Sequence, residues 1–360
     1  MEKELFINGR FLSQPLTGVQ RYARELLHEM DVLLGDAGPW QGLRIICLIP
    51  PCDIVIPAWK HIETRQMGIN RGNLWEQIDL PLFLHGRFLF SPTNIGPWFY
   101  ANQAVTFHDA STFAIPEAYS RLFRLKYRLI FNRLVHIVRI ILTDSRFSQF
   151  ELSHFLGVPI ERFLIIGLGG NHFRDIAPDI TILGRHGLGK KNYLLTVASQ
   201  SPHKNFGRIL QAARTLTNVE FAAAGGSFRK VFQQSSLDSI PSNVHILGYV
   251  NDYELKALYE NALGFIFPSL YEGFGLPVLE AMNSGCPVLS SSAASLPEVG
   301  GEAALYFDPC DVDSMTTAIR IFLSDSTLQN ELKVRGLAHA RNYTWEKTAL
   351  ATLTTLQNYM

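Results

Sequence analysis

The chain has 360 residues, 47% of them apolar, and its 32 Lys and Arg residues balance 32 Asp and Glu residues. This length accommodates two domains, the composition is that of a packed globular protein, and the balanced charge excludes a general attraction to nucleic acid. The four cysteines lack the spacing of a zinc site or a disulfide framework, and no apolar run reaches the roughly 18 residues of a membrane span. Because the first residues also lack the apolar core of a signal peptide, we expect a cytoplasmic protein.

The first half of the chain alternates short apolar runs with longer helical patterns. Strands are predicted at residues 4–9, 44–50, 87–93, 103–109, 139–145 and 162–169. Helices are predicted to begin at Val19, Ala118 and Ser145. Such alternation favours a parallel sheet with helices on both faces.

The second half of the chain repeats this pattern. Strands are predicted at residues 193–199, 219–225, 244–250, 264–269, 287–291 and 303–309. Helices are predicted over 204–216 and 251–262, and the latter begins with Asn251 and Glu254 in the spacing of a capping box.

The segment between the halves, residues 171–191, shows no apolar period and contains three glycines, so we place the domain boundary there. The N-terminal domain is predicted over 1–175 and the C-terminal domain over 176–344. A last helix, 345–360, is expected to pack back on the N-terminal domain. Doubly wound domains of this type bind ligands at the carboxyl ends of their strands.

The stretch LYEGFGLPVLEAMNSGCPV, residues 270–288, reads as a glycine loop and a short helix that follow the strand at 264–269. Gly273 and Gly275 let a ligand approach the main chain, and the N–H groups at the helix start attract phosphate or sugar oxygens. Glu280 is placed to bind a vicinal diol such as a ribose. The alternative is a surface loop before a helix whose glutamate favours the positive end of the helix dipole.

Several stretches, in this order, resemble the family 4 retaining glycosyltransferases. They are TGVQRYARELL from Thr17, VTFHD from Val105, LTDSRFSQ from Leu142, ASQSPHKNF from Ala198, LGYVNDYELKALYENA from Leu247 and FPSLYEGFGLPVLEAMNSGCPV from Phe267. The match covers nearly the whole chain. Within the family, the chain resembles most the bacterial mannosyltransferases that build O-antigen or other surface polysaccharides. It implies the GT-B fold, an α/β architecture of two Rossmann-like, doubly wound domains facing across a cleft.

The resemblance implies donor-binding roles in the C-terminal domain. Glu280 corresponds to the carboxylate that holds the ribose, Glu272 to the one near the donor sugar, and Lys204 to the cation that neutralises the diphosphate. The amides that lie along sugar and phosphate are those of Phe274, Gly275 and Leu276. Glu272 and Lys204 are candidate catalytic residues, because the leaving nucleoside diphosphate gains negative charge in the transition state.

The sequence departs from the family pattern at Ser199 and His203, where the family often carries arginine. Arg229 or Lys230, after a pair of glycines, are candidates to supply the missing charge. An ordinary exposed surface position is an equally good interpretation of both residues.

The N-terminal domain adds two residues to the implied site. Gly18 corresponds to a glycine that lets the backbone approach the phosphate and the acceptor; otherwise it is a simple helix-start glycine. His108 follows a strand at its carboxyl end, where we expect a catalytic contact with the donor sugar, although a lone histidine is usually structural. Asp109 is expected to orient the loop or the histidine.

Three other patterns have structural interpretations. The DVD triplet at 311–313 resembles the metal-binding motif of another glycosyltransferase fold, but it starts a predicted helix, where acidic residues cap and favour the dipole. GLGGN, from Gly167, is too short for a dinucleotide fingerprint and is expected to begin the hinge between the domains. Ser145 is predicted to cap its helix. We therefore expect no metal and no nicotinamide.

The predicted function is transfer of a hexose, mannose by preference, from a nucleotide-sugar to a glycan or lipid-linked oligosaccharide acceptor in surface polysaccharide or O-antigen synthesis. GDP-mannose is the expected donor, and no cofactor is expected. The alternatives are a nucleotide-sugar epimerase or a phosphorylase of the same fold, and a non-catalytic subunit that binds sugar nucleotides. A phosphorylase requires a cofactor-lysine site that the sequence does not show, and the intact site residues argue against an idle subunit.

Residues 118–143 contain six Lys or Arg and no acidic residue. Three basic residues share a helical face beside a stripe of leucines: Arg121, Arg124 and Arg128 beside Leu122, Leu125 and Leu129. We expect the part over 118–139 to lie on anionic lipid at the inner face of the membrane, because each cation near such a surface contributes about 1 kcal/mol. The alternative is a packed helix with a solvated basic face.

Overall fold

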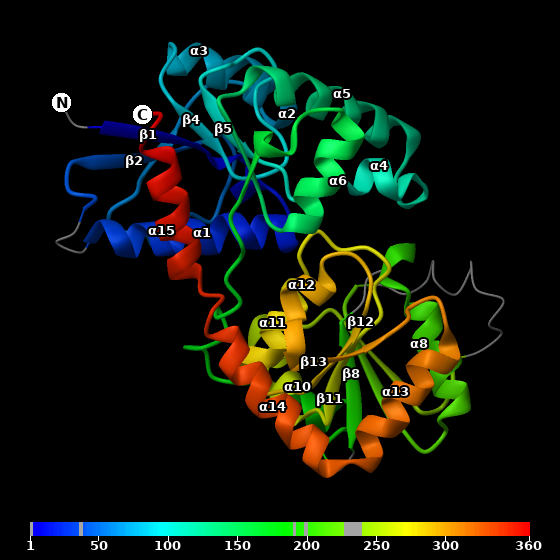
Figure 1. Ribbon diagram of the computed structural model, residues 1–360. Coiled ribbons are helices and arrows are strands. Elements are labelled where there is room, and N and C mark those ends of the chain that lie inside the picture. Colours follow the sequence, from blue (N-terminus) through cyan, green and yellow to red (C-terminus); the bar gives the residue numbers. More distant parts are fainter. Residues whose placement is uncertain (1–2, 36–38, 190–191, 198–200, 227–239) are drawn as a thin grey trace. The chain divides into compact units, whose positions relative to one another are not determined.

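The computed structural model describes residues 3–35, 39–189, 192–197, 201–226 and 240–360. The chain divides into two compact units: unit 1 is Met1–Gly169 with Trp345–Met360, and unit 2 is Gly170–Thr344 (Figure 1). The division falls within the GLGGN segment, at residue 169 rather than the expected 175. The last helix of the chain belongs to unit 1.

Unit 1 is built on a sheet of seven parallel strands in the order β3-β2-β1-β4-β5-β6-β7. The strands are β1 (Lys3–Asn8), β2 (Leu43–Ile49), β3 (Glu63–Gln66), β4 (Leu89–Ser91), β5 (Gln103–Thr106), β6 (Ile140–Thr143) and β7 (Phe163–Ile165). In register, Phe6 of β1 lies opposite Ile46 of β2 and Leu89 of β4. The strands predicted in the first half are all present. The sequence does not predict β3, because its residues ETRQ are polar and it pairs only with β2 at the sheet edge.

The helices of unit 1 cover this sheet. They are η1 (Gly9–Ser13), α1 (Gly18–Gly35), α2 (Gly72–Leu74), η2 (Trp75–Asp79), α3 (Leu80–Leu84), α4 (Ser111–Ala114), η3 (Pro116–Ala118), α5 (Arg121–Ile137), α6 (Arg146–Leu156), η4 (Ile160–Arg162) and α15 (Trp345–Leu356). The prediction that Ser145 caps a helix is confirmed, because its hydroxyl accepts the Ser148 N–H. α5 begins after the predicted Ala118 because Ser120 provides its cap.

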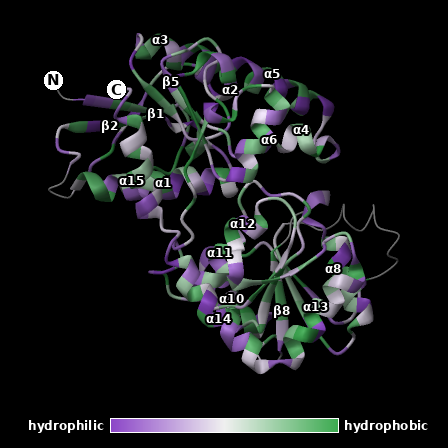
Figure 2. Cartoon of the chain, in the orientation of Figure 1, coloured by the Kyte–Doolittle hydropathy of each residue, from purple (hydrophilic) through white to green (hydrophobic). Residues whose placement is uncertain are grey.

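Two hydrophobic clusters join helices to the sheet of unit 1. In the first, Phe6, Trp75 and Leu80 connect the sheet to the continuous helical segment α2–η2–α3. The second connects β5, β6 and β7 to α5 and α6. α1 and α15 lie side by side (Figure 1), where Tyr22 contacts Trp345. In Figure 2 the helices alternate between hydrophobic and hydrophilic bands, as expected for elements that bury one face.

Unit 2 contains a sheet of six parallel strands in the order β10-β9-β8-β11-β12-β13. The strands are β8 (Tyr193–Val197), β9 (Glu220–Ala224), β10 (Val244–Gly248), β11 (Gly264–Phe267), β12 (Val288–Ser291) and β13 (Ala304–Phe307). The strands predicted in the second half are therefore confirmed. Nearly all residues of β8, β11 and β12, inside the sheet, are buried, which is typical of a parallel sheet covered by helices on both faces.

The helices described in unit 2 complete the second doubly wound domain. They are α7 (Thr181–Arg185), η5 (Pro202–Lys204), α8 (Phe206–Thr215), α10 (Asp252–Asn261), α11 (Leu276–Asn283), α12 (Leu296–Gly300), η6 (Gly301–Ala303), α13 (Val312–Ser324) and α14 (Ser326–Ala340). The predicted capping box is confirmed at α10, where Asn251 and Glu254 each accept the other's backbone N–H. One core cluster joins the sheet to α8 and α13 through Ile209, Ile266 and Phe322.

Both sheets reverse their strand order at one point, between β1 and β4 in unit 1 and between β8 and β11 in unit 2. In open parallel sheets this reversal leaves a crevice outside the carboxyl ends of the two strands, which is the usual ligand position. The loops after β8 and β11 are the ones that carry Lys204 and Glu272. The connectivity of unit 2 thus brings these two candidate residues to one location.

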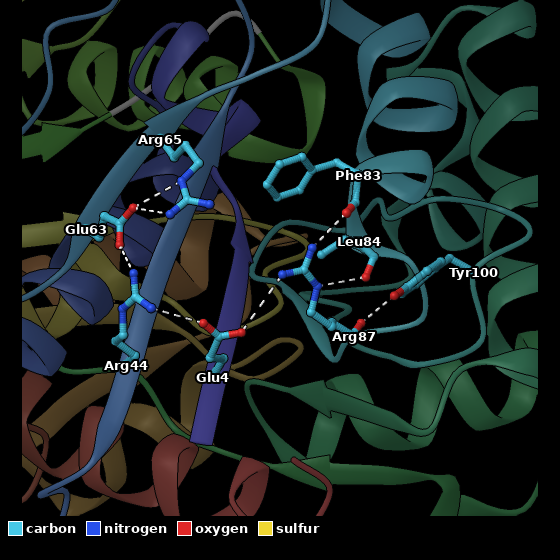
Figure 3. Close-up of polar contacts among 8 residues, drawn as sticks. All are labelled: Glu4, Arg44, Glu63, Arg65, Phe83, Leu84, Arg87 and Tyr100. Carbon is cyan, nitrogen blue, oxygen red and sulfur yellow. Dashed lines mark hydrogen bonds and ion pairs between the residues drawn. The ribbon is translucent and has the colours of Figure 1, made fainter. Parts of the chain in front are cut away.

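Charged side chains connect the amino-terminal ends of the strands in unit 1 (Figure 3). Arg44 bridges Glu4 and Glu63, with nitrogen–oxygen distances of 3.2 and 2.6 Å. Arg87 lies over the Phe6 ring, 4.7 Å from its centroid, and donates to two backbone carbonyls of α3. Since these ion pairs are substantially exposed, each contributes little to the stability of the fold. The network lies at the amino-terminal ends of the strands, opposite the carboxyl ends where ligands usually bind.

A buried carboxylate fixes the segment that precedes β3. The side chain of Asp31, near the end of α1, accepts the backbone N–H groups of Lys60, His61 and Ile62 at 2.7–2.8 Å. Burial by itself raises the pKa of Asp31, but the three N–H donors outweigh it and lower that pKa below its ordinary value. The ionised carboxylate therefore stabilises the folded state.

We expect Asp31→Asn to lower the free energy of unfolding of unit 1 by about 1–3 kcal/mol at neutral pH, because buried N–H groups lose a charged acceptor. A carboxyl whose pKa is depressed by folding stabilises the folded state fully at pH values above its unfolded pKa of about 3.9. This stabilisation is lost as the pH falls through the folded pKa. The difference between wild type and variant should therefore shrink below about pH 4. All five tryptophans lie in unit 1, so urea unfolding followed by tryptophan fluorescence reports on this unit.

Asp53→Asn, at an exposed carboxylate of the same unit, is the matched control. A deficit for Asp31→Asn that stays constant down to about pH 3, or an equal deficit in the control, would contradict this role for Asp31.

Candidate active site

The glycine loop after β11 leads directly into α11. Gly275 precedes this helix with φ of +107°, and a Cβ there would lie 2.5 Å from Cδ2 of Leu296. The backbone conformation therefore strongly favours glycine, and any Cβ would also have to displace the Leu296 side chain. Pro277 lies in the first turn of α11, where its missing N–H costs no helical hydrogen bond.

Side chains on both sides hold this loop in place. The Ser295 hydroxyl donates to the carbonyls of Glu272 and Phe274, at 2.9 and 2.7 Å. The side chains of Phe274 and Leu276 are buried, and Phe274 packs edge-on against Tyr343. The three residues predicted to present amides to the donor, 274–276, thus belong to a fixed strand–loop–helix junction.

Lys204 and Glu272 form the central ion pair of the candidate site. The Lys204 Nζ lies 2.7 Å from Glu272 Oε1, and the two side chains are 22% and 13% exposed. Nζ also lies 5.4 Å from the centroid of the Phe267 ring. The backbone supports the pair, because the Leu270 N–H donates to the His203 carbonyl at 2.7 Å. The structure therefore brings together these two predicted residues from the loops after β8 and β11.

Asn205 holds the same two loops and was not singled out by the sequence. It adopts a left-handed conformation with φ of +57°, and its side-chain amide donates to the carbonyls of Pro268 and Pro309 at 3.0 and 2.8 Å. Asparagine tolerates this conformation better than most residues with a side chain. Asn205 thereby fixes the position of Lys204, its neighbour in the chain.

Glu280, the predicted ribose ligand, is buried in the middle of α11 at 5% exposure. Its Oε2 accepts a hydrogen bond from the Tyr259 hydroxyl at 3.2 Å, and its Oε1 lies 3.2 Å from His172 Nε2. Sequence reasoning missed both partners, which are 21 and 108 positions away. At the start of α11 the Val278 N–H donates to the Gly275 carbonyl at 3.0 Å and Pro277 has no N–H. N–H groups at a helix start in general favour anions.

His108 lies in unit 1 after β5, and both of its ring nitrogens have partners. Nδ1 is 2.7 Å from Asp144 Oδ2, and Nε2 is 3.1 Å from the Pro92 carbonyl, to which it donates. Tyr22 packs edge-on against the ring, with centroids 4.7 Å apart. Burial opposes the charged imidazolium, but the Asp144 carboxylate outweighs it and raises the pKa of His108.

The carboxylate that orients the His108 ring is that of Asp144, not that of Asp109. Asp109 accepts the Ser111 N–H at 2.8 Å and so orders the loop, whereas Asp144 holds the ring. Asp144 follows β6, the neighbouring strand, so its place at the same sheet edge was the available signal. Contact between His108 and a donor sugar stays a prediction, and it requires a nitrogen that is engaged here to change partner.

Gly18 is the first residue of α1, one position before the predicted helix start at Val19. Its φ lies outside the left-handed region, and a Cβ built there meets no atom within 4 Å in the described part of the chain. The packing described in unit 1 therefore gives no reason for glycine at this position. The prediction that a ligand approaches its backbone stays untested.

Other sequence interpretations have different outcomes. Ser199, Arg229 and Lys230 lie outside the described residues. The interpretation of the DVD triplet as a helix start is confirmed, because the Asp311 carboxylate accepts the Asp313 N–H at 2.9 Å and caps α13.

Comparison with known proteins identifies the family. Residues 181–338 match the family model described as Glycosyl transferases group 1. The chain is 29% identical to the O-antigen chain mannosyltransferase B of Escherichia coli, over 95% of this chain and 96% of the relative. The chain belongs to the family 4 glycosyltransferases. As a glycosyltransferase, it transfers a sugar from a donor to an acceptor.

Solved structures show that this glycosyltransferase has the expected GT-B fold. Sucrose-phosphate synthase from Thermosynechococcus elongatus superposes with a TM-score of 0.76 at 17% identity, over 99% of both chains. The Anabaena protein Alr3699/HepE in complex with UDP-glucose gives 0.73 at 18% identity, also over 99% of both chains. At these identities the likeness concerns the fold, two Rossmann-like domains with parallel sheets.

The geometry of unit 2 suits one requirement of glycosyl transfer. As the donor bond breaks, negative charge accumulates on the leaving diphosphate, and a fixed cation in a partly buried site stabilises it without reorganisation. Lys204 is such a cation, since Glu272 and the hydrogen bonds of Asn205 hold it at the carboxyl ends of β8 and β11. The Glu272 carboxylate reduces the net charge of the site and can accept hydrogen bonds from sugar hydroxyls.

We expect Lys204→Ala to lower the turnover number on the order of 10²-fold, as loss of one preorganised donor does. The measurement is initial-rate kinetics at saturating donor. Lys333→Ala, which removes an exposed lysine of the same unit, should retain wild-type turnover. A reduction smaller than about threefold in a folded Lys204→Ala protein would show that leaving-group charge is stabilised elsewhere.

Proposed function

We propose that this glycosyltransferase moves a mannosyl residue from GDP-mannose to a glycan or lipid-linked glycan during assembly of O-antigen or a related surface polysaccharide. The observation that carries the proposal is the match to the O-antigen chain mannosyltransferase B over nearly the full length of both chains. The O-antigen chain mannosyltransferase RfbU of Salmonella typhimurium, 28% identical over 61% of this chain, supports it.

The proposed donor site lies on unit 2. Lys204 neutralises the diphosphate, Glu272 contacts the transferred sugar, and Glu280 binds the ribose hydroxyls. The paired loops after β8 and β11 support this assignment, because they carry a cation and a carboxylate beside a glycine turn at the strand-order reversal. The HepE structure in complex with UDP-glucose supports a nucleotide-sugar as the donor class. The mannosyltransferase relatives are the reason for proposing mannose.

We further propose that α5 lies on anionic lipid at the inner face of the membrane, where a lipid-linked acceptor is available. No helix in the described part of the chain is long and apolar enough to span a bilayer, so this contact is peripheral. Leu122, Leu125 and Leu129 support it, with exposures of 81%, 58% and 51%. Figure 2 shows α5 with adjacent hydrophilic and hydrophobic bands.

In the structure, the arginines of α5 are less solvated than the sequence predicts, so apolar contact has a larger part in the proposed lipid binding. Arg128 lies over the Phe113 ring, 5.3 Å from its centroid, and Arg124 is half-buried, so the predicted row of three arginines is not fully solvated. Arg121 is exposed, and Arg133 lies over the exposed ring of Phe99. The surface is therefore more apolar than the sequence predicts, and it combines inserted leucines with a basic rim.

The donor and the stereochemistry can be tested together. GDP-mannose should be consumed with a lipid-linked acceptor, with EDTA in excess, and proton NMR of the early product should show the donor's α configuration preserved. We expect the α configuration to be retained because inversion requires a general base, and no side chain of the proposed site is assigned that role. A β-linked product, loss of activity in EDTA that manganese restores, or an altered sugar still attached to GDP would each contradict the proposal. Lys204→Ala controls for contaminating activity.

Flotation with anionic vesicles tests the membrane surface. Wild type should float with vesicles containing phosphatidylserine at low salt, and Arg121→Glu with Arg124→Glu should abolish flotation, since two attractive charges become repulsive. Leu122→Ser with Leu125→Ser should also weaken it. The control pair Arg320→Glu with Arg335→Glu reverses two exposed charges on unit 2 and should leave flotation unchanged. Wild type that ignores these vesicles at low salt would show that α5 is only a structural helix.

A further inference from the structure

The buried surroundings of Glu280 come from two elements distant in sequence. Tyr259, on α10, is fully buried, and its hydroxyl donates to Oε2 at 3.2 Å. His172 lies three residues after the first segment of unit 1 ends; its side chain is 2% exposed, and its Nε2 lies 3.2 Å from Oε1. The histidine contact is an ion-pair distance rather than an aligned hydrogen bond. The carboxylate thus has a different polar neighbour on each oxygen.

The segment that carries His172 is fixed against α11. The Gly170 N–H donates to the Tyr343 carbonyl at 3.0 Å, and a Cβ at Gly170 would lie 2.5 Å from Cβ of Leu279. Only glycine allows the segment to approach the helix this closely. On its far side, Lys256 Nζ donates to the carbonyls of Phe173 and Ile176 at 2.9 and 2.8 Å. His172 therefore reaches Glu280 through a segment held at both ends.

These contacts leave the carboxylate able to bind a ligand. A carboxylate has two oxygens and about four lone-pair positions, so each oxygen that has one internal neighbour can accept a further hydrogen bond. The Glu280 side chain keeps 7% of its exposure. A free glutamate side chain samples many rotamers, and ordering it on binding costs affinity. A carboxylate held in advance by neighbours avoids most of that cost.

We propose that His172 and Tyr259 are positioning residues for nucleotide recognition, which hold the Glu280 carboxylate in the orientation that accepts the two ribose hydroxyls. This inference rests on the proposed function, in which Glu280 binds the ribose. The ligand is a nucleoside diphosphate with free 2′- and 3′-hydroxyls. His172 and Tyr259 contact Glu280 and act on the ligand only through it. The segment at the start of unit 2 therefore takes part in donor recognition.

The test compares GDP with 2′,3′-dideoxy-GDP by calorimetry. Wild type should bind GDP more tightly, and His172→Leu and Tyr259→Phe should each weaken GDP about tenfold, the size expected when one contact to a charged group is lost. Affinity for the dideoxy nucleotide should not change, because the hydroxyls that Glu280 recognises are absent from it. His172→Gln, which keeps a donor side chain, should recover part of the lost GDP affinity. A merely structural defect would weaken both nucleotides alike.

The matched control is His245→Leu. His245 pairs with Glu220 at 2.6 Å, near the amino-terminal ends of β9 and β10, and its loss should change neither affinity. If His172→Leu does not fold, Tyr259→Phe still decides the question, because it removes one hydroxyl and keeps the ring packed against Phe265.

Glu280→Gln separates the two levels of the proposal. If this variant does not reduce the preference for GDP over the dideoxy nucleotide, the ribose assignment of the proposed function is wrong. If it does reduce the preference while His172→Leu and Tyr259→Phe, both folded, retain it or weaken both nucleotides equally, only the positioning inference is overturned.

Discussion

Parallel strands connected through helices leave all their strand-to-helix loops at one edge of the sheet, and this constraint organises both units of the glycosyltransferase. In unit 2 it brings the loop after β8 against the loop after β11, so that Lys204 and Glu272, 68 positions apart, form an ion pair. In unit 1 it places His108 after β5 beside Asp144 after β6. The polar groups meet because of strand order, and no local motif contains either pair.

Burial of charge imposes a second requirement on both units, because an unpartnered charge in the interior is costly. Glu76, in the π-helical turn η2, accepts from Asn8 and Arg10 at 2.8 and 2.7 Å. Asp31 satisfies three backbone N–H groups, and Glu280 lies between a tyrosine and a histidine. Carboxylates held in this way have fixed orientations, which is what a binding site needs for recognition without reorganisation.

The exposed face of α5 contrasts with these satisfied interiors. Contiguous apolar side chains on a protein surface mark interaction sites, whereas single exposed ones are ordinary. Leu122, Leu125 and Leu129 form a continuous stripe, while the same helix buries Ile130 and Phe131 in the core of unit 1. The helix therefore has two apolar faces, of which packing uses one. The proposed lipid contact gives the other face a partner whose charge matches the surrounding arginines.

The sequence by itself determined the strands of both sheets, since parallel strands buried on two faces require continuous apolar runs that can be read locally. It also determined the glycine loop before α11, because Gly275 has a conformation that few other residues adopt. The sequence does not predict the edge strand β3, because its residues ETRQ are polar and form no apolar run. Only the tertiary structure decided that Asp144, and not the adjacent Asp109, holds His108, and that His172 and Tyr259 flank Glu280. The reason is that a side chain's partner depends on which loops the strand order brings together, and neither periodicity nor residue spacing encodes that three-dimensional proximity.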